Sequence, residues 1–452
     1  MSAIAAFPMG ILISTAIVQR KLLVLAAIVV VGLACVWPVE MAIGIFTVLI
    51  PFEQVLALGN SGTTINWVAG AFAGATLVLY GFASGRFQSP PRAAFYWGLF
   101  VLWTVASTTW AIEPDTSLKW LATGPTLFAF YIVAVSIRVT RRQLSRICLL
   151  IVVGGVVAAS LIIFQFAHHI SFEGRASLVV GELQANPNAL AFTLLLPFSL
   201  ALRALASDVG GLKRTALLAS LTLTAISILL TMSRGSLIAL AAITLVYLFR
   251  AGVGKRVLLP ISILAIPLFF LPNLFYQRLE RAANDRGTGR YDIWLAGLEI
   301  VKRNPIFGTG LANFPVAYRS VSGYAHVFPL RGYTRDAHNT YLQVCAEMGL
   351  IGFGLFIAAI WSQMATAHRH LSNRHPRDYL GIAIEAACWG QLMMGLSGNI
   401  EWSKSFWLAF TLLALAGQER TEAVPLAFRL PIEQSKNWDP RPNAWRNRWR
   451  TI

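Results

Sequence analysis

The chain has 452 residues, of which 56% are hydrophobic and only 13% are charged. A soluble globular domain carries about 25% charged residues, so the composition excludes an ordinary soluble protein. The formal net charge of +17 would suggest nucleic-acid binding in a soluble chain. Here most basic residues lie in short loops and in the C-terminal tail, which is the pattern that sets membrane topology and attracts anionic lipid headgroups.

The first 91 residues are the hardest to divide into membrane spans. Three apolar runs are visible there, while Lys21 and Arg86 flank them on what should be the same side of the membrane. An even number of crossings is therefore required, and one run is expected to be short or re-entrant. No cleavable signal peptide stands out, because the first apolar stretch leads directly into further ones.

After residue 91, apolar runs of roughly bilayer-spanning length alternate with short polar loops. A spanning helix needs about 20 mainly apolar residues, and these runs are too continuous for the alternating pattern of barrel strands. We therefore predict an all-α polytopic integral membrane protein with about 12 transmembrane helices, within a range of roughly 11–14. The predicted spans cover residues 92–111, 118–137, 144–166, 188–206, 214–232, 235–249, 257–272, 341–366, 380–398 and 403–417.

Lysine and arginine are concentrated in every second loop, and such loops face the cytoplasm. The basic loops are 84–92, 138–146, 210–214, 250–256 and 368–377. The loops expected on the outer face are 113–117, 168–188, 233–235, 273–340 and 398–404. Residues 1–452 are predicted to form one transmembrane domain, with a long outer loop at 273–340 that carries short helices and a cytoplasmic tail at 418–452.

The segment "TMSRGSLIAL" places Arg234 in a very short outer loop between two apolar helices. A charge at that depth is energetically unfavourable and usually functional. Ser233 can cap a helix that begins at Gly235, and a guanidinium beside free helix amides is a suitable site for phosphate. The alternative is an arginine whose head group extends to the lipid headgroups.

The long outer loop contains "RGTGRYDIWLAGLEIVKRNPIFGTGLANF", with Arg286 and Arg290 flanking a Gly-Thr-Gly turn. An amphipathic helix is predicted from Arg290 onward, which places this arginine at a helix start and so near a possible anion. The alternative for Arg290 is a surface ion pair with Asp285 or Asp292. The glycine-rich turn that follows is weak evidence for phosphate binding and reads better as structural. The apolar stripe expected on the helix is Ile293, Trp294, Gly297, Leu298 and Val301.

The stretch "RDAHNTYLQVCAEMGLIG" enters the next span with His338 at its boundary. Asp336 is expected to be the N-cap residue, which would place His338 in the first helical turn. A helix N-terminus disfavours a cation, so the imidazole should be neutral and able to accept a proton from a hydroxyl. The alternative is a histidine that only forms hydrogen bonds at the interface.

Other polar residues on the outer face are secondary candidates. Asn186 and Asn188 stand at a helix entry, where they could bind sugar hydroxyls or simply cap the helix. His326 lies in the middle of the long loop and could assist His338. Glu401 and Lys404 are expected to lie outside the membrane as a mutual pair.

The sequence carries no H-E-x-x-H motif, no acidic cluster on an outer loop, no C-x-x-C spacing and no P-loop. We therefore expect no metal and no cofactor. Arginines and one histidine on a single face suit a reaction whose leaving group is already a phosphate.

Three stretches together resemble the O-antigen ligase family, within a broader ligase and polymerase superfamily. They are "SRGS" at 233–236, "GRYDIWLAGLEIVKRNPIFGTGLANF" at 289–314 and "AHNTYLQVCAEMGLIG" at 337–352. The resemblance extends over about 185–400, and its most specific part is the His-Asn pair at His338 and Asn339 that leads into a Glu-x-Gly-x-x-Gly helix.

The resemblance implies a GT-C-like fold and a metal- and ATP-independent glycosyltransferase of the inner membrane with a periplasmic active site. It implies transfer of O-antigen glycan from undecaprenyl pyrophosphate to a hydroxyl of the lipid A–core oligosaccharide, which completes lipopolysaccharide. Its essential arginines correspond to Arg234 and Arg290, and its essential histidine to His338. Arg286, Asn339, Asn186, Asn188 and His326 are possible accessory residues. The implied partners are the lipid-linked donor, the lipid A–core acceptor and membrane lipid, without nucleic acid.

Three other functions remain open. An O-antigen polymerase and a protein O-oligosaccharyltransferase would share the donor and the key residues, because the acceptor is chosen by loop shape. A lipid or glycan transporter would explain the number of spans and a buried arginine, but it would distribute charges through the middle of the membrane.

Overall fold

The computed structural model describes residue 33 and residues 36–58, 63–206, 209–252, 290–321, 335–373 and 377–418. The predicted span at 257–272 lies outside the described residues, as do Arg286 and His326. The same holds for residues 273–289 and 322–334 of the predicted outer loop and for nearly all of the tail at 418–452. The chain divides into two units, residues 1–419 and 420–452, and every described residue belongs to the first unit. The predicted single domain stays a prediction.

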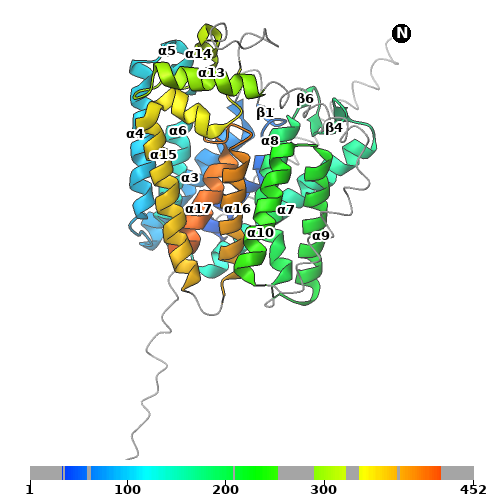
Figure 1. The fold of residues 1–452 in the computed structure, drawn as a ribbon. Coiled ribbons are helices and arrows are strands. Elements are labelled where there is room, and N and C mark those ends of the chain that lie inside the picture. The colour runs from blue at the N-terminus through cyan, green and yellow to red at the C-terminus, as the bar shows by residue number, and fades with distance from the viewer. Residues whose placement is uncertain are drawn as a thin grey trace, which may run out of the picture. The chain divides into compact units, whose positions relative to one another are not determined.

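Helices make up most of the described chain, and their bounds follow the predicted spans closely (Figure 1). The α-helices are α2 (Pro38–Leu49), α3 (Ile65–Ser84), α4 (Arg92–Ala106), α5 (Pro114–Trp120), α6 (Thr123–Val135), α7 (Arg141–Ala167), α8 (Pro187–Ala201), α9 (Gly211–Leu230), α10 (Arg234–Ala251), α13 (Arg290–Arg303), α14 (Phe314–Val321), α15 (Thr340–Ser372), α16 (Tyr379–Met394) and α17 (Lys404–Gln418). Short 3-10 helices are η1 (Ile50–Phe52), η3 (Ser107–Thr109) and η4 (Leu202–Leu205).

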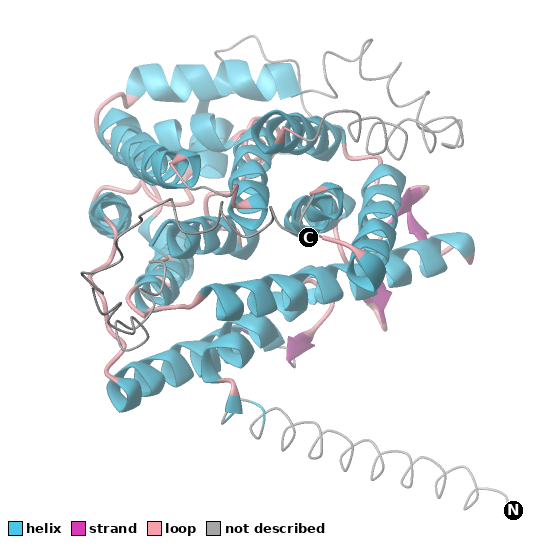
Figure 2. Cartoon of the chain, turned by 90° about the horizontal axis from the view of Figure 1, so that it is seen from below, coloured by secondary structure: helices cyan, strands magenta, loops and turns pink. Residues whose placement is uncertain are grey.

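In the described part of the chain, strands occur only as small hairpins of two two-residue strands near the ends of helices (Figure 2). Each pair is antiparallel. The pairs are β1 (Ala57–Leu58) with β2 (Thr63–Thr64), β3 (Ser171–Phe172) with β4 (Arg175–Ala176), and β5 (Val179–Val180) with β6 (Leu183–Gln184).

Within the described ranges, seven segments are long and apolar enough to cross a bilayer. The segment Pro38–Phe52 and the helices α4, α16 and α17 are shorter apolar helices. The predicted polytopic helical membrane fold is therefore confirmed. The total of about 12 spans stays a prediction, because part of the chain lies outside the described residues. The seven segments are Ile65–Ser84, Pro114–Val135, Arg141–Ala167, Pro187–Leu205, Gly211–Leu230, Arg234–Ala251 and Thr340–Ser372.

The centre of the helical unit is formed by helices that are apolar all round. Every residue of α17 from Ser405 to Ala416 is buried, and α8 and α16 are buried on most of their surface. Such helices must be enclosed by others. Peripheral helices instead expose large apolar side chains such as Phe249, Phe82 and Trp361. Those exposed faces suit contact with lipid.

One end of the helices is covered by the short helices α5, α13 and α14 (Figure 1). The amphipathic helix predicted from Arg290 is confirmed as α13, which packs on α14 and α15. Its buried stripe consists of Ile293, Ala296, Gly297 and Ile300. The expected place of Leu298 in this stripe is wrong, because 52% of the leucine surface is exposed. The helix is rotated so that Gly297 faces Leu342 of α15 at close range.

The glycine-rich turn after α13 is a structural element rather than an anion site. Its amides at Thr309 and Gly310 donate to the carbonyls of Ala346 and Glu347, so they are not free for a ligand. The carbonyls of Ala346 and Glu347 can accept these bonds because α15 is kinked at Gly349, where φ is 65°. The turn and the kink thus fix the entry of α15 against the end layer.

Candidate active site

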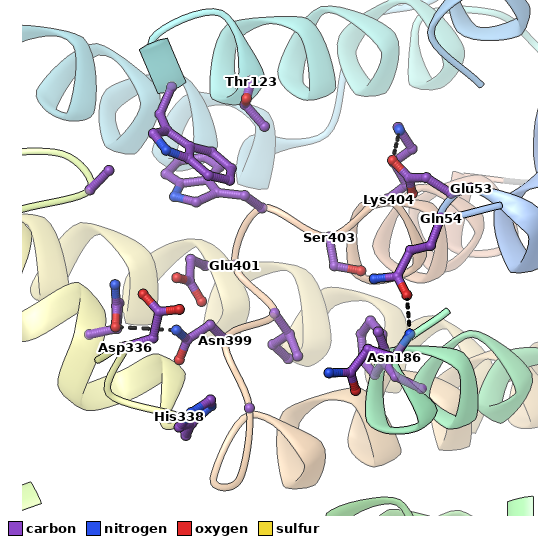
Figure 3. A pocket seen from close by; sticks show the side chains of 18 of the residues that line it. Glu53, Gln54, Thr123, Asn186, Asp336, His338, Asn399, Glu401, Ser403 and Lys404 are labelled. Carbon is purple, nitrogen blue, oxygen red and sulfur yellow. Dashed lines mark hydrogen bonds and ion pairs between the residues drawn. The ribbon is translucent and has the colours of Figure 1, made fainter. Parts of the chain in front are cut away.

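A cavity of about 1390 Å³ opens at the end of the molecule that carries α5, α13 and α14 (Figure 3). Its walls come from η1, α5, α6, the start of α8, the loop before α14, the segment before α15 and the loop between α16 and α17. Arg290, His338, Asn186 and Asn188 all line it. The structure therefore brings together residues that were selected from three separate stretches of sequence.

His338 lies directly before α15 rather than in its first turn. The helix begins at Thr340, and the side-chain oxygen of Asn339 caps it by accepting from the amides of Tyr341 and Leu342 at 3.0 and 3.1 Å. The expectation that Asp336 is the N-cap is therefore wrong. The chain reverses at His338, whose φ of 47° is in the left-handed region, so the cap falls one residue later than the histidine.

The unusual backbone of His338 is held from both sides. The amide of Ala337 donates to Gln343 Oε1 at 2.9 Å, and the amide of Asn339 donates to Asn399 Oδ1 at 3.1 Å. Asn399 Nδ2 also donates to Gln343 Oε1 at 3.3 Å, which joins the two supports. A non-glycine residue at positive φ costs about 1–3 kcal/mol and persists only where its surroundings fix it. Gln343 and Asn399 were not selected from the sequence.

Arg290 begins α13 and points to the loop that follows α16. Its guanidinium donates to Ser397 Oγ at 2.7 Å. The described residues include no ion pair between Arg290 and Asp292, and Asp285 lies outside them. The other predicted arginine, Arg234, begins α10 and lies beside this corner rather than on the cavity wall. A Cβ atom on Gly235 would lie 2.4 Å from Ser397 Oγ, so the start of α10 packs directly against the serine that holds Arg290.

The turn before α10 differs from expectation in one detail. Ser233 occupies the N-cap position, but the helix begins at Arg234 and the serine hydroxyl pairs with Ser236 Oγ at 3.0 Å. Burial and the positive charge of Arg234 both lower the pKa of Arg290. Two neighbouring guanidiniums disfavour each other's charge, and a dianionic ligand between them would relieve that repulsion.

The environment of His338 favours its neutral form. Burial is the main cause that lowers the pKa of the ring, and the charge of Arg290 acts in the same direction. Asp336 opposes this effect. At neutral pH the imidazole therefore has one nitrogen able to accept a proton.

Two of the glutamates that line the cavity, Glu347 and Glu401, are buried. Glu401 is buried and accepts from Thr340 Oγ1 at 2.9 Å, and burial raises its pKa to about 7. The predicted pairing of Glu401 with Lys404 is wrong, because Lys404 forms its ion pair with Glu53. Glu347 accepts from the amide of Ala312 at 2.9 Å and so ties α15 to the segment before α14. Among the described residues, no group of histidine, cysteine or acidic side chains has the arrangement of a metal site.

Asn186 and Asn188 act first as structural groups. Asn186 caps α8 by accepting from the amide of Asn188 at 2.9 Å, as the capping alternative predicts. Asn188 Oδ1 in turn accepts from the buried Arg175 at 2.6 Å. Arg175 also donates to the carbonyl of Thr231 at 2.8 Å, which steadies the turn before Arg234. Arg175 was missed because its loop is long and mixed in charge, without a helical or strand pattern that would indicate burial.

One comparison with known proteins matches the part of the chain that carries the three candidate residues. Residues 219–357 match the model of a family described as O-antigen ligase. This stretch contains Arg234, Arg290 and His338, and the resemblance that the sequence suggested is confirmed over it. The match supports glycosyl transfer of the ligase or polymerase type in a multi-pass membrane protein.

A solved structure gives a more distant likeness. A chain in a structure described as a peptidoglycan synthase complex that coordinates polymerization and crosslinking is 16% identical, with a TM-score of 0.42. The alignment covers 72% of this chain and 96% of that chain. No curated protein matches the sequence.

Proposed function

We propose that the protein is an O-antigen ligase of the bacterial inner membrane, with its active site facing the periplasm. It would transfer a glycan from undecaprenyl pyrophosphate to a hydroxyl of the lipid A–core oligosaccharide. The observation that carries this proposal is the convergence of Arg290 and His338 on one cavity, with Arg234 beside them. The family match over the same residues supports it independently.

The reaction needs only one proton acceptor and a site for the leaving group. The acceptor hydroxyl oxygen attacks the anomeric carbon while the bond from that carbon to the pyrophosphate oxygen breaks. Undecaprenyl pyrophosphate departs with the bonding electron pair, and His338 takes the hydroxyl proton. A single displacement of this kind inverts the anomeric configuration. The neutral state of His338, favoured by burial and by Arg290, is the state that this step requires.

The arginines contribute charge stabilisation. Negative charge grows on the pyrophosphate as the glycosidic bond breaks, and fixed cations stabilise it without reorganising. Arg290 is already oriented by Ser397 before substrate arrives. Arg234 adds a second positive charge. Arg175 stabilises the turn before Arg234 by donating to the carbonyl of Thr231.

Complementation in a strain that lacks the gene tests the proposal. Wild type should restore long-chain lipopolysaccharide, while His338→Ala should leave polymerised glycan on the carrier lipid. A carrier-linked glycan that remains one repeat long would instead identify a polymerase. If the strain without the gene makes normal lipopolysaccharide but leaves a protein acceptor without glycan, the protein is instead a protein O-oligosaccharyltransferase. Normal pools of every product with His338→Ala would contradict the assigned role of the histidine.

A further inference from the structure

A second hollow of about 520 Å³ lies between α3 and α6 and is lined mainly by apolar side chains. It shares Trp67, Thr126, Leu127 and Lys404 with the active-site cavity, so the two spaces adjoin each other. We call this second space the α3–α6 groove. Phe46, Asn66, Gly70, Gly74 and Leu79 also line it.

The length of the α3–α6 groove matches one leaflet of a bilayer. Its lining on α3 extends from Asn66 to Leu79. At 1.5 Å per residue this distance is about 20 Å, and one leaflet of the hydrocarbon core is about 15 Å thick. The helices α3 and α6 both belong to candidate membrane spans, so the groove is a slot at membrane depth that begins at the cavity.

The groove is open because its floor is made of small residues. A Cβ atom added to Gly74 would meet no atom within 4 Å, and one added to Gly70 would only touch the ring of Phe46 at 3.4 Å. No side chain of the described residues fills the space in front of Gly74. A volume of about 300–1,000 Å³ holds one drug-sized ligand, so the groove has room for one hydrocarbon chain rather than several.

We propose that the α3–α6 groove binds one acyl chain of the glycolipid acceptor. This inference rests on the proposed function, since it assumes that both substrates are anchored in lipid. The groove enters the cavity on the wall that carries Thr123 and Lys404, across from His338 (Figure 3). Arg290 donates to Ser397 in the loop between α16 and α17, against which the start of α10 with Arg234 packs. The same loop supports the backbone next to His338 through Asn399, so both arginines lie on the side of the histidine.

The position across the cavity favours the acceptor over the donor. In a single displacement the attacking hydroxyl approaches the anomeric carbon from the side opposite the leaving pyrophosphate. A donor held by the arginines has its lipid tail attached at that pyrophosphate, so the tail is expected on the arginine side. The groove length also fits an acyl chain that occupies one leaflet better than a long undecaprenyl chain. The ion pair of Lys404 with Glu53 stands where the apolar slot meets the polar cavity, as suits the junction between an acyl chain and its saccharide.

A matched pair of glycine substitutions tests the proposal with purified full-length protein. Gly74→Leu puts a large side chain into the groove at a position where an added Cβ atom meets nothing within 4 Å. Gly354→Leu is the control, because Gly354 lies on the outer surface of α15 and a Cβ there also meets nothing within 4 Å. Both exchanges replace a helical glycine by leucine, so their effects on helix propensity are alike. The substrates are undecaprenyl-linked glycan as donor, with either intact or chemically de-acylated lipid A–core as acceptor.

We expect Gly74→Leu to raise the KM for the intact acceptor about tenfold, which corresponds to losing the contacts of about two methylenes. The KM for the donor and the kcat with de-acylated acceptor should stay at wild-type values. Gly354→Leu should match wild type with all substrates. An unchanged KM for the intact acceptor would overturn the proposal. A raised KM for the donor would also overturn it, because the groove would then hold the prenyl tail.

Native mass spectrometry separates failure of this inference from failure of the proposed function. If the wild-type protein transfers no glycan, the proposed function fails, but binding can still be measured with acylated lipid A alone. An adduct with wild type and Gly354→Leu that is lost with Gly74→Leu supports the groove as an acyl-chain site. Equal lipid A adducts with all three proteins would overturn the groove as an acceptor site. The same conclusion would follow if Gly74→Leu also lost an adduct with an ordinary phospholipid.

Discussion

The side-chain oxygen of Asn399 accepts the backbone hydrogen bond of Asn339, the residue that follows His338, at 3.1 Å. Asn399 lies in the loop between α16 and α17, and Asn339 caps α15. This contact therefore transmits the position of one helix pair to the backbone of the candidate catalytic histidine. Gln343 completes the support on the other side of that histidine.

Asn399→Leu should lower kcat about 10- to 100-fold, because a displacement of the histidine by about 1 Å is enough for an effect of that size. The KM for the donor should change little. Asn399→Asp keeps an oxygen acceptor for the Asn339 amide and should recover much of the activity. Steady-state kinetics of the purified variants measures both effects. Asn373→Leu, at the opposite end of α15, is the control. Wild-type kcat in Asn399→Leu would show that the support is not needed.

Arg290→Ala should lower kcat by about 10²- to 10³-fold, since removing one donor to a developing negative charge costs about 2.7–4 kcal/mol. Arg290→Lys should recover only part of this loss, because an ammonium lacks the planar fork of a guanidinium. The control is Arg303→Ala at the exposed end of the same helix, where the arginine pairs with Glu299. A transfer assay with purified lipid-linked donor decides the matter. Equal rates for Arg290→Ala and Arg303→Ala would remove Arg290 from the mechanism.

The pH dependence should report the protonation of His338. Burial and Arg290 hold its pKa below the ordinary value of 6.5. The neutral ring is the active form, so kcat/KM should be constant above that lowered pKa and fall as the pH drops through it, by about tenfold per unit. A pH–rate profile from about pH 4.5 to 8 covers this range.

Glu401 is a cavity group that could titrate in the same window, since its pKa is raised to about 7. The inflection should disappear in the residual activity of His338→Gln and remain in Glu401→Gln. The reverse result would assign the titration to the carboxyl group and leave His338 as a positioning residue.

The helices could be predicted from the sequence because the apolar runs are long and clearly bounded by charged loops. Residues 144–166, for example, were predicted as a span, and α7 covers Arg141–Ala167. Arg234, Arg290 and His338 could be selected because a charged or titratable group beside a membrane span is unusual. None of these arguments requires knowledge of which helices are neighbours.

The supporting residues could not be predicted, because their roles depend on contacts between distant segments. Ser397 matters only since it lies between Gly235 and Arg290, which are far apart in sequence. The expected pair of Glu401 and Lys404 failed for the same reason: Lys404 begins α17 and turns toward Glu53, which follows η1. Sequence spacing alone offered no sign of either contact.

Gly349→Ala should destabilise the protein, because the kink of α15 permits no side chain. Gly349 has a φ of 65°, and an added Cβ atom would lie 2.1 Å from the carbonyl oxygen of Ile306. Left-handed strain alone costs about 1–3 kcal/mol, and the clash with backbone adds to it. Thermal unfolding of the detergent-solubilised protein should show a lower Tm than wild type. Gly354→Ala, five residues further along the same helix in open space, should leave Tm unchanged or slightly raised. Equal Tm values for the two variants would mean that the kink can relax without loss of stability.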